Sequence, residues 1–141
     1  AGLPALHRAH RLQDRAAGVG FDWDDVDGPA DKVAEELREV RDQIALAPVN
    51  RSLHGAPQHD EAHAAVEAEL GDLLFAVVNL CRKAGVHASL ALDKANAKFA
   101  RRFGAIERLA AARGIDVKTA GLAVLDGLWD EVKAAERAGE R

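Results

Sequence analysis

The chain has 141 residues and a formal net charge of −4; 48% of its residues are hydrophobic and 30% are charged. That length suits one domain with its own core. The acidic balance argues against a nucleic-acid partner, since such binders are normally basic. The longest uncharged stretch of the central predicted helix, residues 73–78, falls far short of the roughly 20 residues that span a membrane, so no membrane partner is expected. The single cysteine, Cys81, excludes an intramolecular disulfide and favours a reducing compartment such as the cytoplasm.

The composition predicts an all-α fold, because alanine is abundant, tyrosine is absent and prolines are few. Apolar residues recur at helical spacing in five segments, and Gly18, Gly85 and Gly114 mark three of the expected ends. Residues 21–25 are expected to form a loop. Residues 48–59 lack periodicity and predict a flexible surface excursion, which could cover the mouth of a site. The five expected helices cover residues 4–17, 30–46, 60–84, 89–113 and 119–138.

The predicted helix over residues 60–84 is apolar on nearly all sides, apart from one narrow polar stripe. At 100° per residue, the stripe contains Glu69, Asp72 and Asn79. A helix with so much apolar surface is normally central and buried. Two carboxylates on it need a partner, because an unpaired buried carboxylate costs several kcal/mol or becomes protonated.

A second acidic pair, Glu36 and Glu39, has the same angular offsets from the apolar seam of the helix over residues 30–46. If the two helices pack together, the pairs can face one another. Four carboxylates in one place would repel one another unless cations lay between them. Ligands that are all oxygen select hard ions, with Mg²⁺ first and Mn²⁺ as a substitute. The sequence therefore predicts a metal site at Glu36, Glu39, Glu69 and Asp72.

A solvated charged face is the alternative interpretation, because glutamates three residues apart usually have no further role. For Glu36 and Glu39 alone it is the more common case, since Arg38 and Arg41 lie close by. The apolar setting of Glu69 and Asp72 favours the metal site.

Several segments resemble the MazG family, one branch of the all-α nucleoside triphosphate pyrophosphohydrolases. The acidic residues match its ExxE…ExxD signature, and the similarity is to the carboxy-terminal domain of two-domain members, over residues 3–136. The segment between Glu39 and Glu69 is longer than is usual in that family. The matching segments are GFDW at 20–23, DKV at 31–33, EELRE at 35–39, ELGDLLFAVVNL at 69–80 and KANAKFARRF at 94–103.

The resemblance implies hydrolysis of nucleoside triphosphates to a monophosphate and pyrophosphate with Mg²⁺, in which a metal-activated water attacks the α-phosphorus. Broad specificity and a house-cleaning role are expected. Glu35 is implied to assist catalysis beside the metal ligands, and Asn79 is either a satisfied buried amide or a sugar or base contact. The other implied substrate-binding residues are Lys32, Lys98, Arg102 and Lys133 for phosphate, with Trp129 for stacking on the base.

Residues 1–141 are expected to form one such domain: a bundle of about five helices with a four-helix core, assembled as a homodimer. The family implies the dimer, and the apolar surface over residues 60–84 supports it. Three alternatives remain: a dUTP-selective or phosphoribosyl-ATP-selective relative, and a non-catalytic helical interaction module. A di-iron bundle would need Glu-x-x-His, which is absent from the sequence. His7 and His10 are expected to be exposed.

Overall fold

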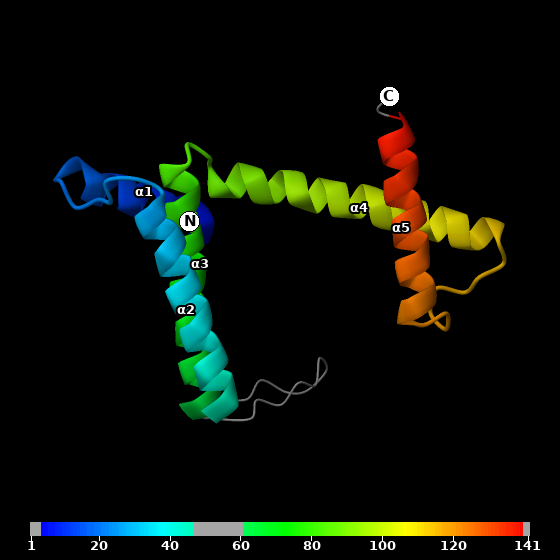
Figure 1. Ribbon diagram of the computed structural model, residues 1–141, viewed down its shortest axis with the longest axis horizontal. Coiled ribbons are helices and arrows are strands. Elements are labelled where there is room, and N and C mark those ends of the chain that lie inside the picture. Colours follow the sequence, from blue (N-terminus) through cyan, green and yellow to red (C-terminus); the bar gives the residue numbers. More distant parts are fainter. Residues whose placement is uncertain (1–3, 47–60, 140–141) are drawn as a thin grey trace. The chain divides into compact units, whose positions relative to one another are not determined.

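Residues 4–46 and 61–139 are described by the structure, a computed structural model. This part of the chain contains helices and no strand, which confirms the all-α class. The excursion expected at residues 48–59 lies outside the described residues. None of the described helices combines the length and apolar character needed to cross a membrane. The helices are α1 (Ala5–Gly18), α2 (Asp27–Leu46), α3 (Glu61–Lys83), α4 (Ala88–Ala112) and α5 (Leu122–Gly139) (Figure 1).

Most helix ends follow the signals in the sequence. Gly85 and Gly114 lie two residues after the last residues of α3 and α4 and have φ values of 76° and 67°, the left-handed conformation that glycine adopts without strain. α2 begins three residues earlier than expected, after Asp25 accepts a hydrogen bond from the Asp27 amide at 2.9 Å. α5 begins three residues later, because Asp116 first closes a separate turn by accepting the Lys118 and Ala120 amides.

The chain forms two compact units, Ala1–Ala91 and Leu92–Arg141. In the first unit, α3 is the central helix, because both α1 and α2 pack against it, and α2 runs alongside it (Figure 1). Its buried apolar side chains include Val40 of α2 and Val66, Ala76 and Val78 of α3. This packing places the acidic stripes of α2 and α3 at one seam.

The second unit pairs α5 with the part of α4 that follows residue 91. Ile106 and Ala110 of α4 and Leu128 of α5 are its buried centre, and Trp129 packs partly buried against them. Arg113 and Glu131 join the two helices at the surface through an ion pair of 2.7 Å. Within the described residues, neither unit by itself contains four packed helices, so the expected four-helix core is not formed within either one.

The apolar surface of α3 is only partly covered within the described residues: Leu70 is 42% exposed and Leu74 is 58% exposed. One expectation about burial is wrong. His7 and His10 are half-buried rather than exposed, because both rings lie against His87. The His10 ring stacks on the His87 ring with centroids 4.4 Å apart. The contacts that bury these two rings come from a segment distant in the sequence.

Candidate metal centre and substrate residues

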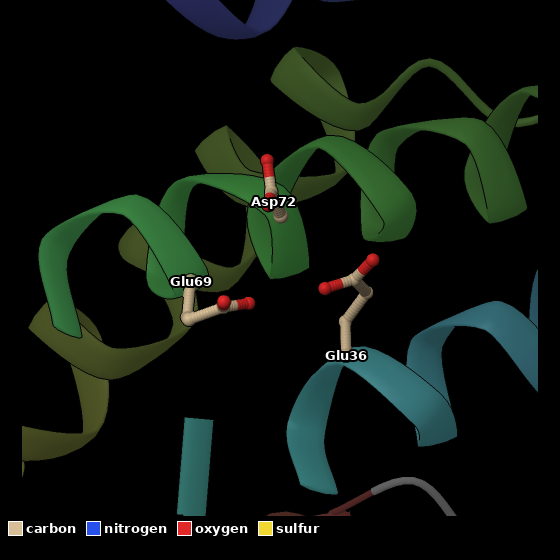
Figure 2. A group of neighbouring side chains, drawn as sticks. All are labelled: Glu36, Glu69 and Asp72. Carbon is tan, nitrogen blue, oxygen red and sulfur yellow. The ribbon is translucent and has the colours of Figure 1, made fainter. Parts of the chain in front are cut away.

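Three carboxylates meet where α2 packs on α3. Glu36, Glu69 and Asp72 each offer one oxygen within 4.8 Å of those of the other two, and we call these residues the acid cluster. Figure 2 shows the Glu36 side chain reaching from α2 toward the two acids of α3. Glu36 lies one turn before the buried Val40, and Glu69 follows the buried Val66 by three residues, so the seam that buries the valines also aligns the acids.

The burial of the acid cluster is graded from one side to the other. Glu36 is only 6% exposed, Glu69 is half-buried and Asp72 is exposed. The cluster therefore has a closed end at α2 and an open end at Asp72, where a ligand from solvent can enter. A carboxylate as buried as Glu36 requires a compensating positive charge.

Lys32 supplies part of that compensation. Its Nζ lies 3.2 Å from Oε1 of Glu36 and 3.4 Å from Oε1 of Glu35. The hydrogen bonds to Glu36 and Glu35 raise the pKa of Lys32, so the ammonium stays charged. Glu35 itself is about half exposed.

Two carboxylate oxygens of the acid cluster take part in none of these contacts. Oε2 of Glu36 and Oε2 of Glu69 are buried and have no hydrogen-bond partner within residues 4–46 and 61–139. Orphaned carboxylate oxygens are costly to bury, whereas a hard divalent cation would satisfy them. The donor set therefore fits the Mg²⁺ or Mn²⁺ that the sequence predicts.

Glu39 lies beside the acid cluster rather than within it. Its pKa is raised above the ordinary value of 4.5, first by the neighbouring Glu36 carboxylate and then by desolvation and the charge of Glu69. The four carboxylates predicted from the sequence are therefore neighbours. The negative charges of Glu36 and Glu69 repel that of Glu39, and a bound cation would remove this repulsion.

Asn79 lies two turns beyond Asp72 on α3 and bonds to a residue that the sequence analysis did not single out. Its Oδ1 accepts hydrogen bonds from Nε and Nη2 of Arg82, at 3.1 and 2.9 Å. Arg82 also pairs with Asp22, and this contact lowers the pKa of the Asp22 carboxyl to about 2. The sequence indicated a role for Arg82 only weakly, because an arginine near the C-terminus of a helix is common.

The second unit holds the remaining predicted substrate residues. The Arg102 guanidinium contacts Oε1 and Oε2 of Glu136, at 3.2 and 3.0 Å, and lies 5.5 Å from the centre of the Trp129 ring. Lys98 is exposed, and its charge helps Arg102 to lower the pKa of Glu136. Lys133 is half-buried on α5. Glu136 was missed by the sequence analysis, since its role depends on the α4–α5 packing.

The comparisons with known proteins agree with this arrangement. The MazG nucleotide pyrophosphohydrolase domain matches residues 30–104, a range that includes the acid cluster. A protein named nucleoside triphosphate pyrophosphohydrolase from Escherichia coli is 44% identical over 95% of this chain and 46% of its own length. One named nucleoside triphosphate pyrophosphohydrolase/pyrophosphatase MazG from Thermotoga maritima is 37% identical over the same shares. The chain thus spans about half the length of these relatives.

Proposed function

We propose, from the premise that this chain belongs to the MazG nucleotide pyrophosphohydrolase domain family, that it hydrolyses nucleoside triphosphates to a monophosphate and pyrophosphate. The names of the Escherichia coli and Thermotoga maritima relatives support this reaction. The observation that carries the proposal is the acid cluster, in which buried oxygens of Glu36 and Glu69 have no hydrogen-bond partner in the described part of the chain. Ribo- and deoxyribonucleotides with different bases are all expected to be substrates.

Glu36, Glu69 and Asp72 would hold Mg²⁺, or Mn²⁺ in its place, with Glu39 completing the set. When bound, the cation would neutralise part of the triphosphate's negative charge and make a water molecule more acidic. Lys32 holds Oε1 of Glu36, and Oε2 of Glu36, which has no hydrogen-bond partner among the described residues, would be available to the cation. Glu35, half exposed beside them, is placed to accept a proton from the attacking water.

The cationic residues would bind the substrate's phosphates. Lys98, Arg102 and Lys133 of the second unit carry positive charge, which a triphosphate requires before a nucleophile can approach. Lys32 can also bind phosphate once a bound cation has replaced it as the partner of Glu35 and Glu36. Trp129 offers an indole and Asn79 an amide for contacts to the nucleoside. The role of these residues in binding is part of the proposal.

We also propose that the chain acts as a homodimer within the cytoplasm. The exposed apolar residues of α3, such as Leu70 and Leu74, need cover. A second copy would supply it and complete a four-helix core from two α2–α3 pairs. Residues 1–141 then form one domain of that dimer. The single Cys81 agrees with a reducing compartment.

A product assay tests the proposed reaction. The common ribo- and deoxyribonucleoside triphosphates would be incubated with the protein and Mg²⁺, and pyrophosphate, orthophosphate and the nucleotide products measured separately. We expect pyrophosphate and monophosphate from several substrates. Orthophosphate with a diphosphate would show that the attack occurs at another phosphorus, and turnover of dUTP alone would indicate the selective alternative.

Matched variants connect that activity to the acid cluster. Glu36→Gln and Asp72→Asn should each abolish pyrophosphate release, because each removes one of the converging carboxylates. Glu67→Gln, an exposed change on the same helix as Asp72, should keep it. Full activity in both cluster variants would place the metal site elsewhere.

A further inference from the structure

Cationic side chains of the second unit gather around one carboxylate. Glu136 lies near the C-terminal end of α5, which crosses α4 (Figure 1). Hydrogen bonds from Arg102 are the largest cause that lowers the pKa of Glu136. The positive charges of Arg102, Arg101 and Lys98, all on α4, lower it further. Glu136 is therefore ionised at neutral pH, and we call it and these three cations the α4–α5 cluster.

Glu136 holds one edge of the Arg102 guanidinium. Nε of Arg102 donates hydrogen bonds to Oε1 and Oε2 of Glu136 at 3.2 and 3.0 Å, and Nη2 lies 3.0 Å from Oε2. The side chains of Arg102 and Glu136 are only 21% and 30% exposed, so water competes less for this pair than for an ion pair on the open surface. A guanidinium bonded along one edge has a fixed orientation as well as a fixed position.

The indole of Trp129 restricts the guanidinium from a second direction. Cζ of Arg102 lies 5.5 Å from the ring centre, and the indole packs partly buried on the core of the second unit. Trp129 and Glu136 are almost two full turns apart on α5, so they share the side of that helix that meets Arg102. A long arginine side chain normally loses much rotamer freedom when it binds a ligand. Here the two neighbours have already restricted it.

The contacts with Glu136 leave the other edge of the guanidinium for a ligand. Glu136 uses the N–H of Nε and one N–H of Nη2. Both N–H groups of Nη1 and the second one of Nη2 are left, and they form the fork that can bind two phosphate oxygens. The carboxylate and a phosphate can therefore contact Arg102 at the same time, on different edges.

A competing interpretation is that Glu136 blocks Arg102 by occupying it in place of phosphate. The bond pattern argues against this, because only the Nε–Nη2 edge is used. The surrounding charges argue against it as well. Without the carboxylate, the positive charges of Lys98, Arg101 and Arg102 would lie near one another with no anion among them, and their repulsion would displace the side chains.

We propose that Glu136 is a positioning residue, which holds the Arg102 guanidinium so that its Nη1–Nη2 edge can bind the phosphates of the nucleotide. This inference rests on the proposed function, in which Arg102 binds phosphate, and adds the residue that orients it. Because Arg102 is oriented before the nucleotide arrives, binding costs less side-chain entropy than it would with a mobile arginine. Glu136 itself contacts no phosphate, since the two anions repel.

A double-mutant cycle tests whether Glu136 acts through Arg102. The quantity measured is kcat/KM for pyrophosphate release from ATP, in the unsubstituted protein, Glu136→Gln, Arg102→Leu and the double variant. Glu136→Gln keeps the size of the side chain but removes its charge, and it should lower kcat/KM roughly tenfold or more. In the Arg102→Leu background the same change should cause no further loss, or a gain, because the carboxylate then only repels the triphosphate.

Glu131→Gln is the matched control. Glu131 is another glutamate of α5, and it accepts hydrogen bonds of 2.7 and 2.8 Å from Arg113, which follows α4 directly. This variant removes a comparable ion pair without touching Arg102, so it should leave kcat/KM unchanged. Glu136→Asp, which keeps the charge on a shorter side chain, should retain more activity than Glu136→Gln.

Three outcomes of the cycle would overturn the proposal. An equal loss from Glu136→Gln in both backgrounds would make Glu136 a purely structural residue. A gain in the protein that keeps Arg102 would show that Glu136 competes with phosphate. Full activity in Arg102→Leu would show that the reaction needs no positioned arginine there. If the unsubstituted protein releases no pyrophosphate from any nucleotide, the proposed reaction itself fails, and that result is read from the unsubstituted protein alone.

The second experiment needs no turnover. The Nε–H resonance of Arg102 would be assigned by its loss in Arg102→Leu and followed by NMR during titration with Mg²⁺ and α,β-methylene ATP, which cannot release pyrophosphate. In the unsubstituted protein the bond to Glu136 should keep this resonance sharp, and the nucleotide should shift it saturably. Glu136→Gln should broaden it and weaken nucleotide binding roughly tenfold, whereas Glu131→Gln should do neither. A sharp resonance and unchanged affinity in Glu136→Gln would overturn the inference.

Discussion

The Lys32 ammonium lies one helical turn before Glu36 and contacts only one of its two carboxylate oxygens, at 3.2 Å. The other oxygen is buried and has no hydrogen-bond partner among the described residues, and the Glu36 carboxylate lies in the acid cluster with Glu69 and Asp72. Lys32 therefore compensates enough charge to keep Glu36 in place without filling the space that the acids share. This division of one carboxylate between a structural partner and a shared site is the basis of the first prediction.

Glu69→Gln should remove the stabilisation that Mg²⁺ gives the folded protein. A ligand at 100 times its Kd adds about 2.7 kcal/mol to the free energy of unfolding, and the variant should lose most of this. In chelator it should melt at the same temperature as the unsubstituted protein or higher, because one repelling charge is gone. Thermal melts with chelator and with Mg²⁺ measure both effects. A much lower melting temperature in chelator would show that Glu69 instead forms a structural ion pair with a lysine or arginine.

Asp22 should contribute to stability above its ordinary pKa and lose that contribution in acid. Arg82 lowers the folded-state pKa from 3.8 to about 2, so the unfolded chain takes up the proton first as the pH falls. Stability should therefore decline between about pH 4 and pH 2. The depressed pKa of Glu136 acts in the same direction, so the comparison must be with Asp22→Asn. Melting curves for that variant should show a shallower decline; identical slopes would contradict the assignment.

Gly28→Ala should destabilise the fold although it lies in a helix. Alanine normally favours a helix interior by up to about 1 kcal/mol over glycine. Here the new Cβ would overlap the Trp23 indole, and overpacking costs about 1–3 kcal/mol. Gly127→Ala on α5, where a Cβ meets nothing within 4 Å in the described chain, should instead stabilise. Denaturant unfolding of both variants checks the opposite signs, and equal stabilisation would show that Trp23 moves freely.

Leu74→Glu should convert the proposed dimer to a monomer. Leu74 is among the more exposed apolar residues of α3, and a charge there would be costly to bury against a second copy. Sedimentation at micromolar concentration should give twice the chain mass for the unsubstituted protein and the chain mass for the variant. Val19→Glu, at the exposed end of α1, serves as the control and should stay dimeric. A monomer before substitution would refute the dimer.

The helices themselves could be predicted locally. Apolar periodicity located all five, and Gly85 and Gly114 marked the ends of α3 and α4, because hydrogen bonding and backbone strain act over a few residues. The angular offsets of Glu36 and Glu69 were also enough to predict that the acidic pairs could meet. Periodicity alone contains that information, since both acids lie beside the seam that packs.

Only the tertiary structure decided what each side chain contacts. Angular position set Glu36 beside the apolar seam, but it did not predict that Glu36 would be only 6% exposed while Glu35 stays about half exposed, because burial depends on how closely another helix covers each face of α2. Gln13 could have been noticed as an amide on the apolar side of α1, but its partner is the Phe75 carbonyl, 62 residues away. Local propensity determines where a helix forms; which polar group is left without a partner depends on the packing of segments far apart in the chain.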